Sequence, residues 1–241
     1  MYKFIHLAFI SVVVLSGCAS SYVTPGGHVD LSNVPDNDIK KIYEQKPTAS
    51  FPANLAYTRV QETGYSNYSS QAYGSGSFSV ITTRDIESDE DIARLAGLPD
   101  IEGITPLSKI IIPAKLSGLR DLRLSAAKLH ADILLVYTLD TTFTVGKKSF
   151  APMELISFGS MDNKEVRVTA TASAAFYDAK TEYLYGLAEA TQQEIGHSDI
   201  WNNSKVVDDL RKLAEKKAFH NLVPEIENTW DKITTKYKQA K

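Results

Sequence analysis

The most regular alternation of apolar and polar residues lies in the second half of the chain. From Val166 to Phe176 apolar residues alternate with polar ones, which is the period of a strand that buries one face. Residues 178–182 have the composition of a turn, and 183–194 return to strand-forming residues. The pattern predicts an antiparallel hairpin over about 165–194, and its run of alanines predicts that a helix or another stretch of backbone packs closely against it.

An earlier segment predicts half of an α/β unit. Leu119, Leu122, Ala126 and Leu129 recur at helical spacing. The residues at 133–137, Ile-Leu-Leu-Val-Tyr, are apolar without a break, as expected of a central strand covered on both faces. The segment therefore predicts a helix followed directly by a buried strand.

Shorter elements surround these two units. They are a helix within 36–45, strands within 51–62, at 78–83 and around 109–112, a helix after Ser88 that ends at Gly97, and two C-terminal helices, one from Asn203 or Ser204 to about Leu222 and one beginning at Pro224. The predicted fold class is α/β or α+β. It has a mixed sheet with an antiparallel hairpin, covering helices and a C-terminal helical pair.

The N-terminus forms a separate unit. Its apolar stretch, Phe4–Leu15, is about a dozen residues long, whereas a helix needs about 20 residues to cross a bilayer. Lys3 precedes the stretch and small residues follow it, which is typical of a secretory signal. A membrane-spanning anchor and a buried strand ending in an inert cysteine are the alternatives.

The quartet Leu15-Ser16-Gly17-Cys18 resembles the lipobox of bacterial lipoproteins. The resemblance implies cleavage after Gly17, diacylglycerol on the Cys18 thiol and acylation of the new amino group, and several acyl chains give stable attachment. Ala19, in place of Asp, implies sorting to the outer membrane, facing the periplasm, in enteric-type bacteria. The implied organisation is a signal peptide at 1–17, a lipidated tether at 18–50 and a single periplasmic α/β domain at 51–241.

Composition narrows the class of protein. The 241 residues are 43% hydrophobic and 23% charged, which argues against a disordered chain and against several membrane spans. The formal charge of −3 gives no basic surplus, so no nucleic-acid partner is predicted. A single cysteine excludes an internal disulfide.

Motifs for catalysis and cofactor binding are missing from the sequence. It has no nucleophilic-serine, zinc-peptidase or phosphate-loop motif, and no histidine pair stands at metal-ligand spacing. We therefore predict no cofactor, no metal and no enzymatic activity. Glu189, among apolar neighbours, is a candidate contact if its face is buried, although Thr191 favours a solvated face. Asp140, expected to close the central strand, is a candidate for ligand contact or for capping a turn.

The loop at 63–77 is rich in Ser, Gly and Tyr. Such a composition is typical of adaptable binding loops, so Tyr65, Tyr68 and Tyr73 are candidate contacts with a partner. A flexible connection without function is the alternative.

Two stretches resemble a group of uncharacterised bacterial envelope lipoproteins. They are "LRLSAAKLHADILLVYTLDTTF" and "KEVRVTATASAAFYDAKTEYLYGLAEAT". In that group the hairpin turn often reads Asp-x-x-Thr-Gly; here Asp178 and Thr181 are present, but Glu182 replaces the glycine. The order of elements is also similar to periplasmic α/β modules such as the N-terminal domain of TolB, the curli-secretion lipoprotein and the lipoprotein activators of penicillin-binding proteins.

The favoured hypothesis is a non-catalytic binding or scaffolding module at a membrane surface. Its partners would be the membrane, through the lipid on Cys18, and another envelope protein or a second copy of itself. One alternative is a lipoprotein that self-assembles into a secretion channel or pore. Another is an envelope hydrolase whose site carries no recognised motif.

Overall fold

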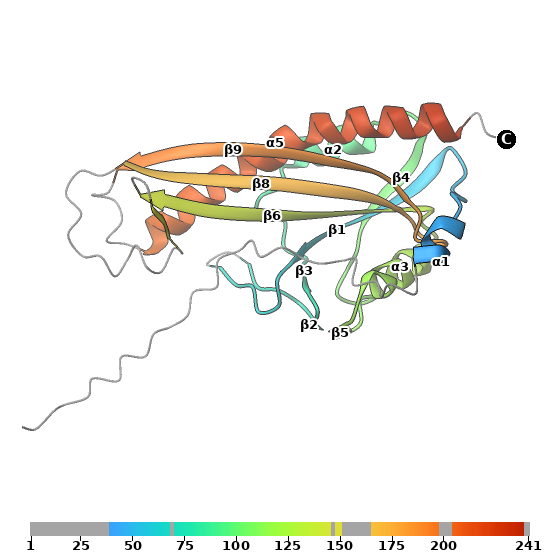
Figure 1. The fold of residues 1–241 in the computed structure, drawn as a ribbon, viewed down its shortest axis with the longest axis horizontal. Coiled ribbons are helices and arrows are strands. Elements are labelled where there is room, and N and C mark those ends of the chain that lie inside the picture. The colour runs from blue at the N-terminus through green and yellow to red at the C-terminus, as the bar shows by residue number, and fades with distance from the viewer. Residues whose placement is uncertain (1–38, 68–69, 146–147, 151–164, 198–203, 239–241) are drawn as a thin grey trace, which may run out of the picture.

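The fold of this computed structural model is described for residues 39–67, 70–145, 148–150, 165–197 and 204–238 (Figure 1). These residues form four helices and nine strands. In chain order they are α1 (Ile39–Glu44), β1 (Ala53–Gln61), β2 (Ser75–Gly76), β3 (Ser79–Ile81), α2 (Asp89–Ala96), β4 (Ile101–Pro106), β5 (Lys115–Leu116), α3 (Leu119–Lys128), β6 (Ile133–Val145), β7 (Lys148–Phe150), β8 (Glu165–Asp178), β9 (Leu184–His197) and α5 (Ser204–Tyr237).

A mixed sheet of seven strands forms the centre of the domain. Its main path runs β3-β1-β6-β8-β9, with β4 paired to β1 and β7 paired to β6. The pairs β1–β4 and β1–β6 are parallel, whereas β6–β8 and β8–β9 are antiparallel. The predicted mixed α/β fold and the hairpin over 165–194 are therefore confirmed.

Three strands of the sheet, β6, β8 and β9, are much longer than the others, and we call them the long strands. Helix α5 covers one face of them, the inner face. Ala170, Ala172 and Ala174 of β8 are buried there in one core with the α5 residues Ala218 and Phe219. Small side chains on the strand let the helix lie close to the sheet, as the alanine run predicted. The helix also lies close to Gly186 of β9, where an added Cβ would lie 2.8 Å from the Thr229 Cγ2 atom.

Helix α3 covers part of the opposite face. Leu122 and Ala126 of α3 are buried in a second core with Leu134 and Val136, which lie in the first part of β6. Beyond Val136 this side of β6 carries half-buried or exposed polar residues, beginning with Thr138. No helix of the described residues covers the rest of this face.

The expected pair of C-terminal helices is wrong, because α5 is one continuous helix with Pro224 inside it. Proline lacks the N–H that would bond four residues back, which normally favours a break. Here the ring of Pro224 is exposed, and buried residues lie on both sides of it, including Leu222 and Ile226. Packing of the helix against the sheet thus outweighs the missing hydrogen bond.

The expected strand around 109–112 is also wrong. These residues form a turn, and Ile110 is 90% exposed, although Ile112 is buried. The carbonyl of Ile111 accepts hydrogen bonds from the Ser125 hydroxyl and the Lys128 ammonium group of α3. A strand in this region does exist a few residues earlier: it is β4, which pairs with β1.

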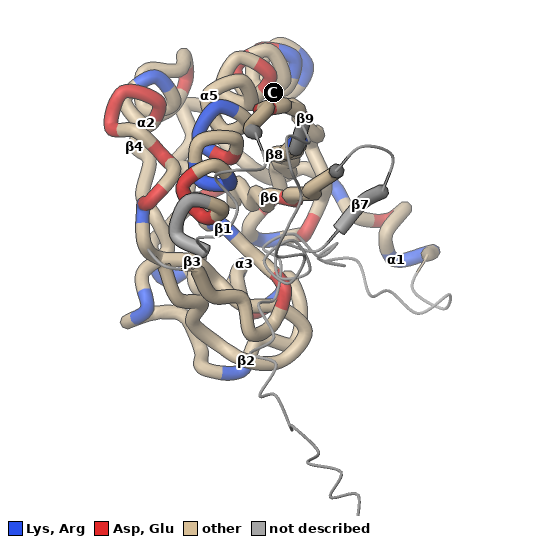
Figure 2. The backbone as a smooth tube through the Cα atoms, turned by 90° about the vertical axis from the view of Figure 1, so that its left-hand side faces the viewer, with Lys and Arg blue, Asp and Glu red and all other residues tan. Residues whose placement is uncertain are grey.

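Helices α2 and α5 lie side by side, and both carry mixed charges (Figures 1 and 2). Arg94 of α2 donates to both carboxylate oxygens of Glu227, at 3.1 and 2.8 Å. The Trp230 indole N–H donates to the carbonyl of Pro99 at 2.7 Å. Within the described part of the chain, no helix has the length and apolar character needed to cross a membrane.

Candidate functional site

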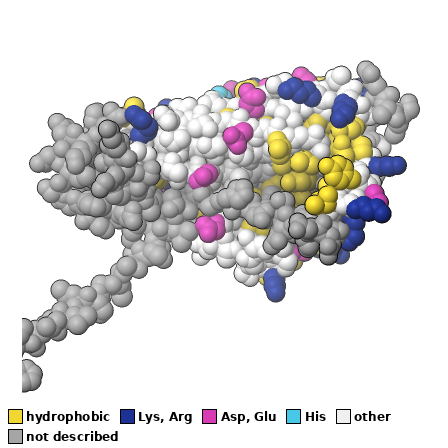
Figure 3. All heavy atoms as spheres, in the orientation of Figure 1, with side chains coloured by type: hydrophobic (Ala, Val, Ile, Leu, Met, Phe, Trp, Pro, Cys, Tyr) yellow, Lys and Arg dark blue, Asp and Glu magenta, His cyan; other side chains and the backbone are white. Residues whose placement is uncertain are grey.

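We name the sheet surface that faces away from α5 the outer face, and it presents side chains of β6, β8 and β9 in rows. Antiparallel pairing places one residue of each strand in every row. The four rows are Thr138–Ser173–Glu189, Asp140–Thr171–Thr191, Thr142–Thr169–Gln193 and Thr144–Arg167–Ile195. Figure 3 views this side of the molecule, whose middle is mainly polar with scattered acidic side chains.

The outer face brings together two of the predicted contact residues. Glu189 and Asp140 lie in neighbouring rows, two strands apart, and both side chains are exposed. The Ser173 hydroxyl donates to Glu189 Oε2 at 2.9 Å. The prediction of a solvated face around Glu189 is therefore confirmed. Asp140, by contrast, neither closes a strand nor caps a turn, because β6 continues past it to Val145.

Strand β9 forms one edge of the sheet, with β8 as its strand partner. The Leu187 carbonyl accepts from the Thr229 hydroxyl, and the Gln193 carbonyl accepts from the Gln192 side chain. These side-chain bonds indicate that the backbone groups of odd-numbered residues point away from β8, as alternation in an antiparallel pair requires. We name the outward backbone groups of residues 189–195 the β9 edge. Their N–H groups have no partner among the described residues.

The three predicted tyrosine contacts have different outcomes. Tyr65 is 1% exposed, so it cannot contact a partner in this conformation. Burial raises the pKa of its hydroxyl to about 12. Tyr73 is half-buried, with Lys109 Nζ 5.8 Å from the ring centre. Tyr68 lies outside the described residues, as do Gly17 and Cys18.

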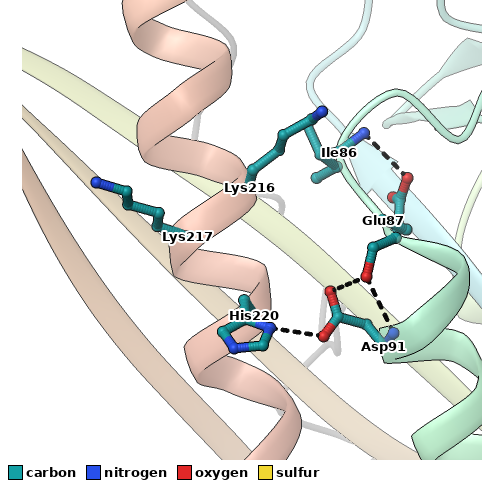
Figure 4. A pocket seen from close by; sticks show the side chains of 7 residues that line it. Ile86, Glu87, Asp91, Lys216, Lys217 and His220 are labelled. Carbon is teal, nitrogen blue, oxygen red and sulfur yellow. Dashed lines mark hydrogen bonds and ion pairs between the residues drawn. The ribbon is translucent and has the colours of Figure 1, made fainter.

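A pocket of about 250 Å³ lies between α2 and α5 (Figure 4). The side chains that line it are Ile86, Glu87, Ser88, Asp91, Lys216, Lys217 and His220. The Ser88 hydroxyl donates to Asp91 Oδ2 at 2.7 Å and caps α2 by accepting from the Asp91 N–H at 3.0 Å. On the other side, His220 Nδ1 lies 2.8 Å from Asp91 Oδ1.

This order of side chains does not suit nucleophilic catalysis. In a serine triad the histidine stands between the hydroxyl and the carboxylate and takes the hydroxyl proton. Here the carboxylate of Asp91 stands between Ser88 and His220, so the imidazole does not face the hydroxyl. The interactions instead join α2 to α5. Across the described residues, no cluster of His, Cys, Asp or Glu side chains is suited to hold a metal ion.

A buried ionic cluster lies behind the pocket. The Arg59 guanidinium, 1% exposed, lies 2.9 Å from Asp85 and 3.5 Å from Glu87. The Tyr137 hydroxyl also donates to Glu87. Burial, followed by the nearby charge of Glu87, raises the pKa of Tyr137 well above its ordinary value.

A second buried ionic cluster lies on α5. Arg211 pairs with Asp208 and with Glu215, which accepts a hydrogen bond from Thr141 of β6 at 2.9 Å. Burial raises the pKa of Glu215 above its ordinary value. Both ionic groups are internal and hold the sheet to its covering elements. Our prediction from the sequence missed them, although Arg59, the single charged residue of β1, was a usable signal.

No protein-family profile matches the sequence, and no curated protein matches it significantly. Among solved structures, it is similar to a candidate lipoprotein of Caulobacter crescentus CB15, with 11% identity and a TM-score of 0.26 over 48% of this chain and 81% of the other. It is also similar to a Xanthomonas campestris protein of the DUF330 family, with 10% identity and a TM-score of 0.33 over 87% of this chain and 98% of the other. Similarity this weak transfers no function to the chain.

Proposed function

We propose that this protein is a lipid-anchored lipoprotein of the bacterial envelope that binds another envelope protein without catalysing a reaction. The lipobox-like quartet ending at Cys18 supports the anchor, and Ala19 supports placement at the outer membrane, facing the periplasm. Anchoring confines the domain to the membrane surface and so raises its effective concentration for partners held there.

The observation that carries the proposal is the open β9 edge. An exposed sheet edge binds extended peptide segments by strand addition, in which backbone hydrogen bonds give affinity and alternate side chains give specificity. The side chains that would contact those of the added strand and give specificity are Glu189, Thr191, Gln193 and Ile195. Ile195, the last of these four β9 residues, is 58% exposed and offers an apolar contact.

The hydrolase alternative has lost its two candidate residues. It required Glu189 or Asp140 to be buried in a deep cleft, where desolvation would perturb the pKa. Both carboxylates are exposed on the outer face. Self-assembly remains a competing outcome, because a sheet edge can also pair with a second copy of itself.

Photo-crosslinking in intact cells tests the proposal. A photoreactive residue replaces Gln193, which is exposed beside the β9 edge, and in a separate strain it replaces Lys115, an exposed residue of β5. We expect a discrete heavier product that contains a second envelope protein from position 193 and none from position 115. Equal products from both positions, or none from 193, would overturn the proposal. A ladder of multiples of this chain would show that the partner is a second copy.

A matched pair of substitutions at Thr191 separates strand addition from side-chain contact. Thr191→Pro removes an outward N–H without touching the bonds to β8, and edge strands tolerate proline at such positions. Thr191→Val keeps the N–H and loses the hydroxyl. Strand addition predicts that Thr191→Pro abolishes the product from position 193 while Thr191→Val retains it. Loss of the product in both variants would instead indicate recognition through the threonine side chain.

A further inference from the structure

We infer that one end of the domain, the turn end, docks directly onto an anionic phospholipid bilayer. The turn end consists of α1, the segment 45–49, the turn between β8 and β9, the first residues of β9 and the last turn of α5. The inference rests on the proposed lipid anchor at Cys18 and adds a second contact, made by the folded domain itself. It also fixes which way the domain points.

Exposed apolar side chains gather at the turn end. In α1, Ile39, Ile42 and Tyr43 are 51%, 44% and 87% exposed, and none of the helix is buried. At the start of β9, Leu184 and Leu187 are 43% and 66% exposed. Figure 3 shows apolar side chains toward this end of the domain, with basic side chains along its margin.

Lysines and tyrosines surround these apolar residues. Lys180 lies in the hairpin turn with a side chain that is 67% exposed, and Lys236 is exposed on the last turn of α5. The Lys236 ammonium group lies 5.0 Å from the ring centre of Tyr237. The Tyr237 hydroxyl is hydrogen-bonded to that of Tyr183 at 2.9 Å. Lys40 and Lys41 of α1 lie at the same end, and Lys40 forms an ion pair with Glu44.

Exposed aliphatic side chains together with tyrosines and lysines suit contact with a bilayer better than contact with water alone. Tyrosine is enriched where membrane meets water, because its ring is apolar and its hydroxyl is polar. Lysines near the surface are attracted to anionic lipid headgroups, and exposed aliphatic side chains gain by entering the boundary with the acyl chains. The acidic residues of three ion pairs lie nearby: Glu182 pairs with Arg123, Asp132 with Lys180 at 3.9 Å, and Glu44 with Lys40 at 3.8 Å.

The chain outside the described part permits this contact. Residues 19–38 separate Cys18 from Ile39, and at roughly 3.3–3.6 Å per residue this length reaches at most about 70 Å. The following segment is fixed to the turn end, because the Thr181 hydroxyl donates to the Lys46 carbonyl and the Thr48 N–H donates to Asp178. The chain that arrives from the membrane therefore meets the domain at the same end that carries the apolar and basic residues. Docking there directs the β9 edge, near Gln193, away from the bilayer.

Depth-dependent fluorescence quenching tests the inference on the full lipidated chain. Lipidation consumes the thiol of Cys18, the natural cysteine, so one introduced cysteine is the single site for a thiol-reactive dye. The dye is placed at Tyr43→Cys and Leu187→Cys in the turn end, and at Gln193→Cys as the matched exposed control on the same strand. The proteins are reconstituted into phosphatidylethanolamine–phosphatidylglycerol vesicles that contain lipids with a quenching nitroxide.

We expect quenching of about twofold or more at positions 43 and 187 and little at position 193. Exchange of phosphatidylglycerol for phosphatidylcholine, or the double substitution Lys180→Gln and Lys236→Gln, should reduce the quenching at 43 and 187. Equal quenching at all three positions, or none at 43 and 187, would overturn the docking. Mass spectrometry of the reconstituted protein tests the anchor separately: an unmodified Cys18 refutes the proposed anchoring, whereas a lipidated chain without quenching refutes the docking alone.

Discussion

The backbone N–H of Thr48 donates a hydrogen bond of 2.6 Å to the carboxylate of Asp178, 130 residues later in the chain. The same carboxylate accepts from the Ala49 N–H at 3.1 Å and from the Tyr185 hydroxyl at 2.8 Å. Asp178 ends β8, so this one side chain ties the segment before β1 to the hairpin. Asp178 is 0% exposed, and both of its oxygens act purely as acceptors while the carboxyl is ionised, whereas protonation turns one of them into an O–H donor.

We expect Asp178→Asn to destabilise the domain by about 2–3 kcal/mol, because hydrogen bonds to a buried charged group are among the stronger ones. Urea denaturation of the two proteins measures the change. The matched control is Glu189→Gln, which neutralises an exposed carboxylate and should change the free energy of unfolding by less than about 0.5 kcal/mol. Equal effects of the two substitutions would show that Asp178 does not hold the N-terminal segment.

The stability contributed by Asp178 should also depend on pH. Burial alone would raise the pKa of this carboxyl, but hydrogen bonds from the N–H groups of Thr181 and Thr48 outweigh burial, and the pKa is lowered. A lowered folded-state pKa means that the stabilisation is complete above the unfolded-state pKa of about 4 and is lost as pH falls through the folded-state value. The difference in unfolding free energy between wild type and Asp178→Asn should therefore be constant above about pH 5 and shrink below about pH 4. A difference that grows on acidification would contradict the assignment.

The buried cluster around Glu87 predicts a graded loss of stability. Tyr137→Phe removes the hydroxyl that donates to Glu87 and should cost about 1–2 kcal/mol. Arg59→Met leaves Asp85 and Glu87 without their cation and should cost about 3–5 kcal/mol. Tyr73→Phe is the control, because its hydroxyl makes one long contact of 3.4 Å, and we expect a change below about 0.5 kcal/mol. Thermal unfolding should show the largest loss of stability for Arg59→Met, a smaller loss for Tyr137→Phe and the smallest for Tyr73→Phe; a Tyr137→Phe variant as stable as wild type would contradict the prediction.

The proline inside α5 predicts a stabilising substitution. Pro224→Ala restores an N–H that can bond to the carbonyl of His220, and the exposed ring leaves no cavity when removed. Loss of the proline ring also raises the conformational entropy of the unfolded chain, which offsets part of the benefit. We therefore expect the free energy of unfolding to increase by about 1 kcal/mol in total. Circular dichroism during urea unfolding measures it, with the exposed neighbouring substitution Glu225→Ala as control. Loss of stability in Pro224→Ala would mean that the ring itself is needed where the helix crosses the sheet.

The sequence by itself determined the elements whose pattern is local. The alternation from Val166 to Phe176 predicted β8, and the unbroken apolar run at 133–137 predicted the first part of the central strand β6. The helix predicted after Ser88 is α2, where the Ser88 hydroxyl accepts from the Asp91 N–H. Such patterns suffice because strand and helix periods are set by the backbone and by burial of one face.

Only the tertiary structure decided which side chains are buried, whether α5 is one helix or two, and which strands lie next to one another in the sheet. Tyr65 was indistinguishable in sequence from an exposed loop tyrosine, yet it is buried, whereas Ile110 in an apolar run is exposed. Pro224 lies inside one helix, because residues on both sides of it pack on strands far away in the chain. Asp140 and Glu189 share the outer face because the pairing of β6, β8 and β9 aligns them. In each case the deciding free energy comes from neighbours distant in sequence, which no local period records.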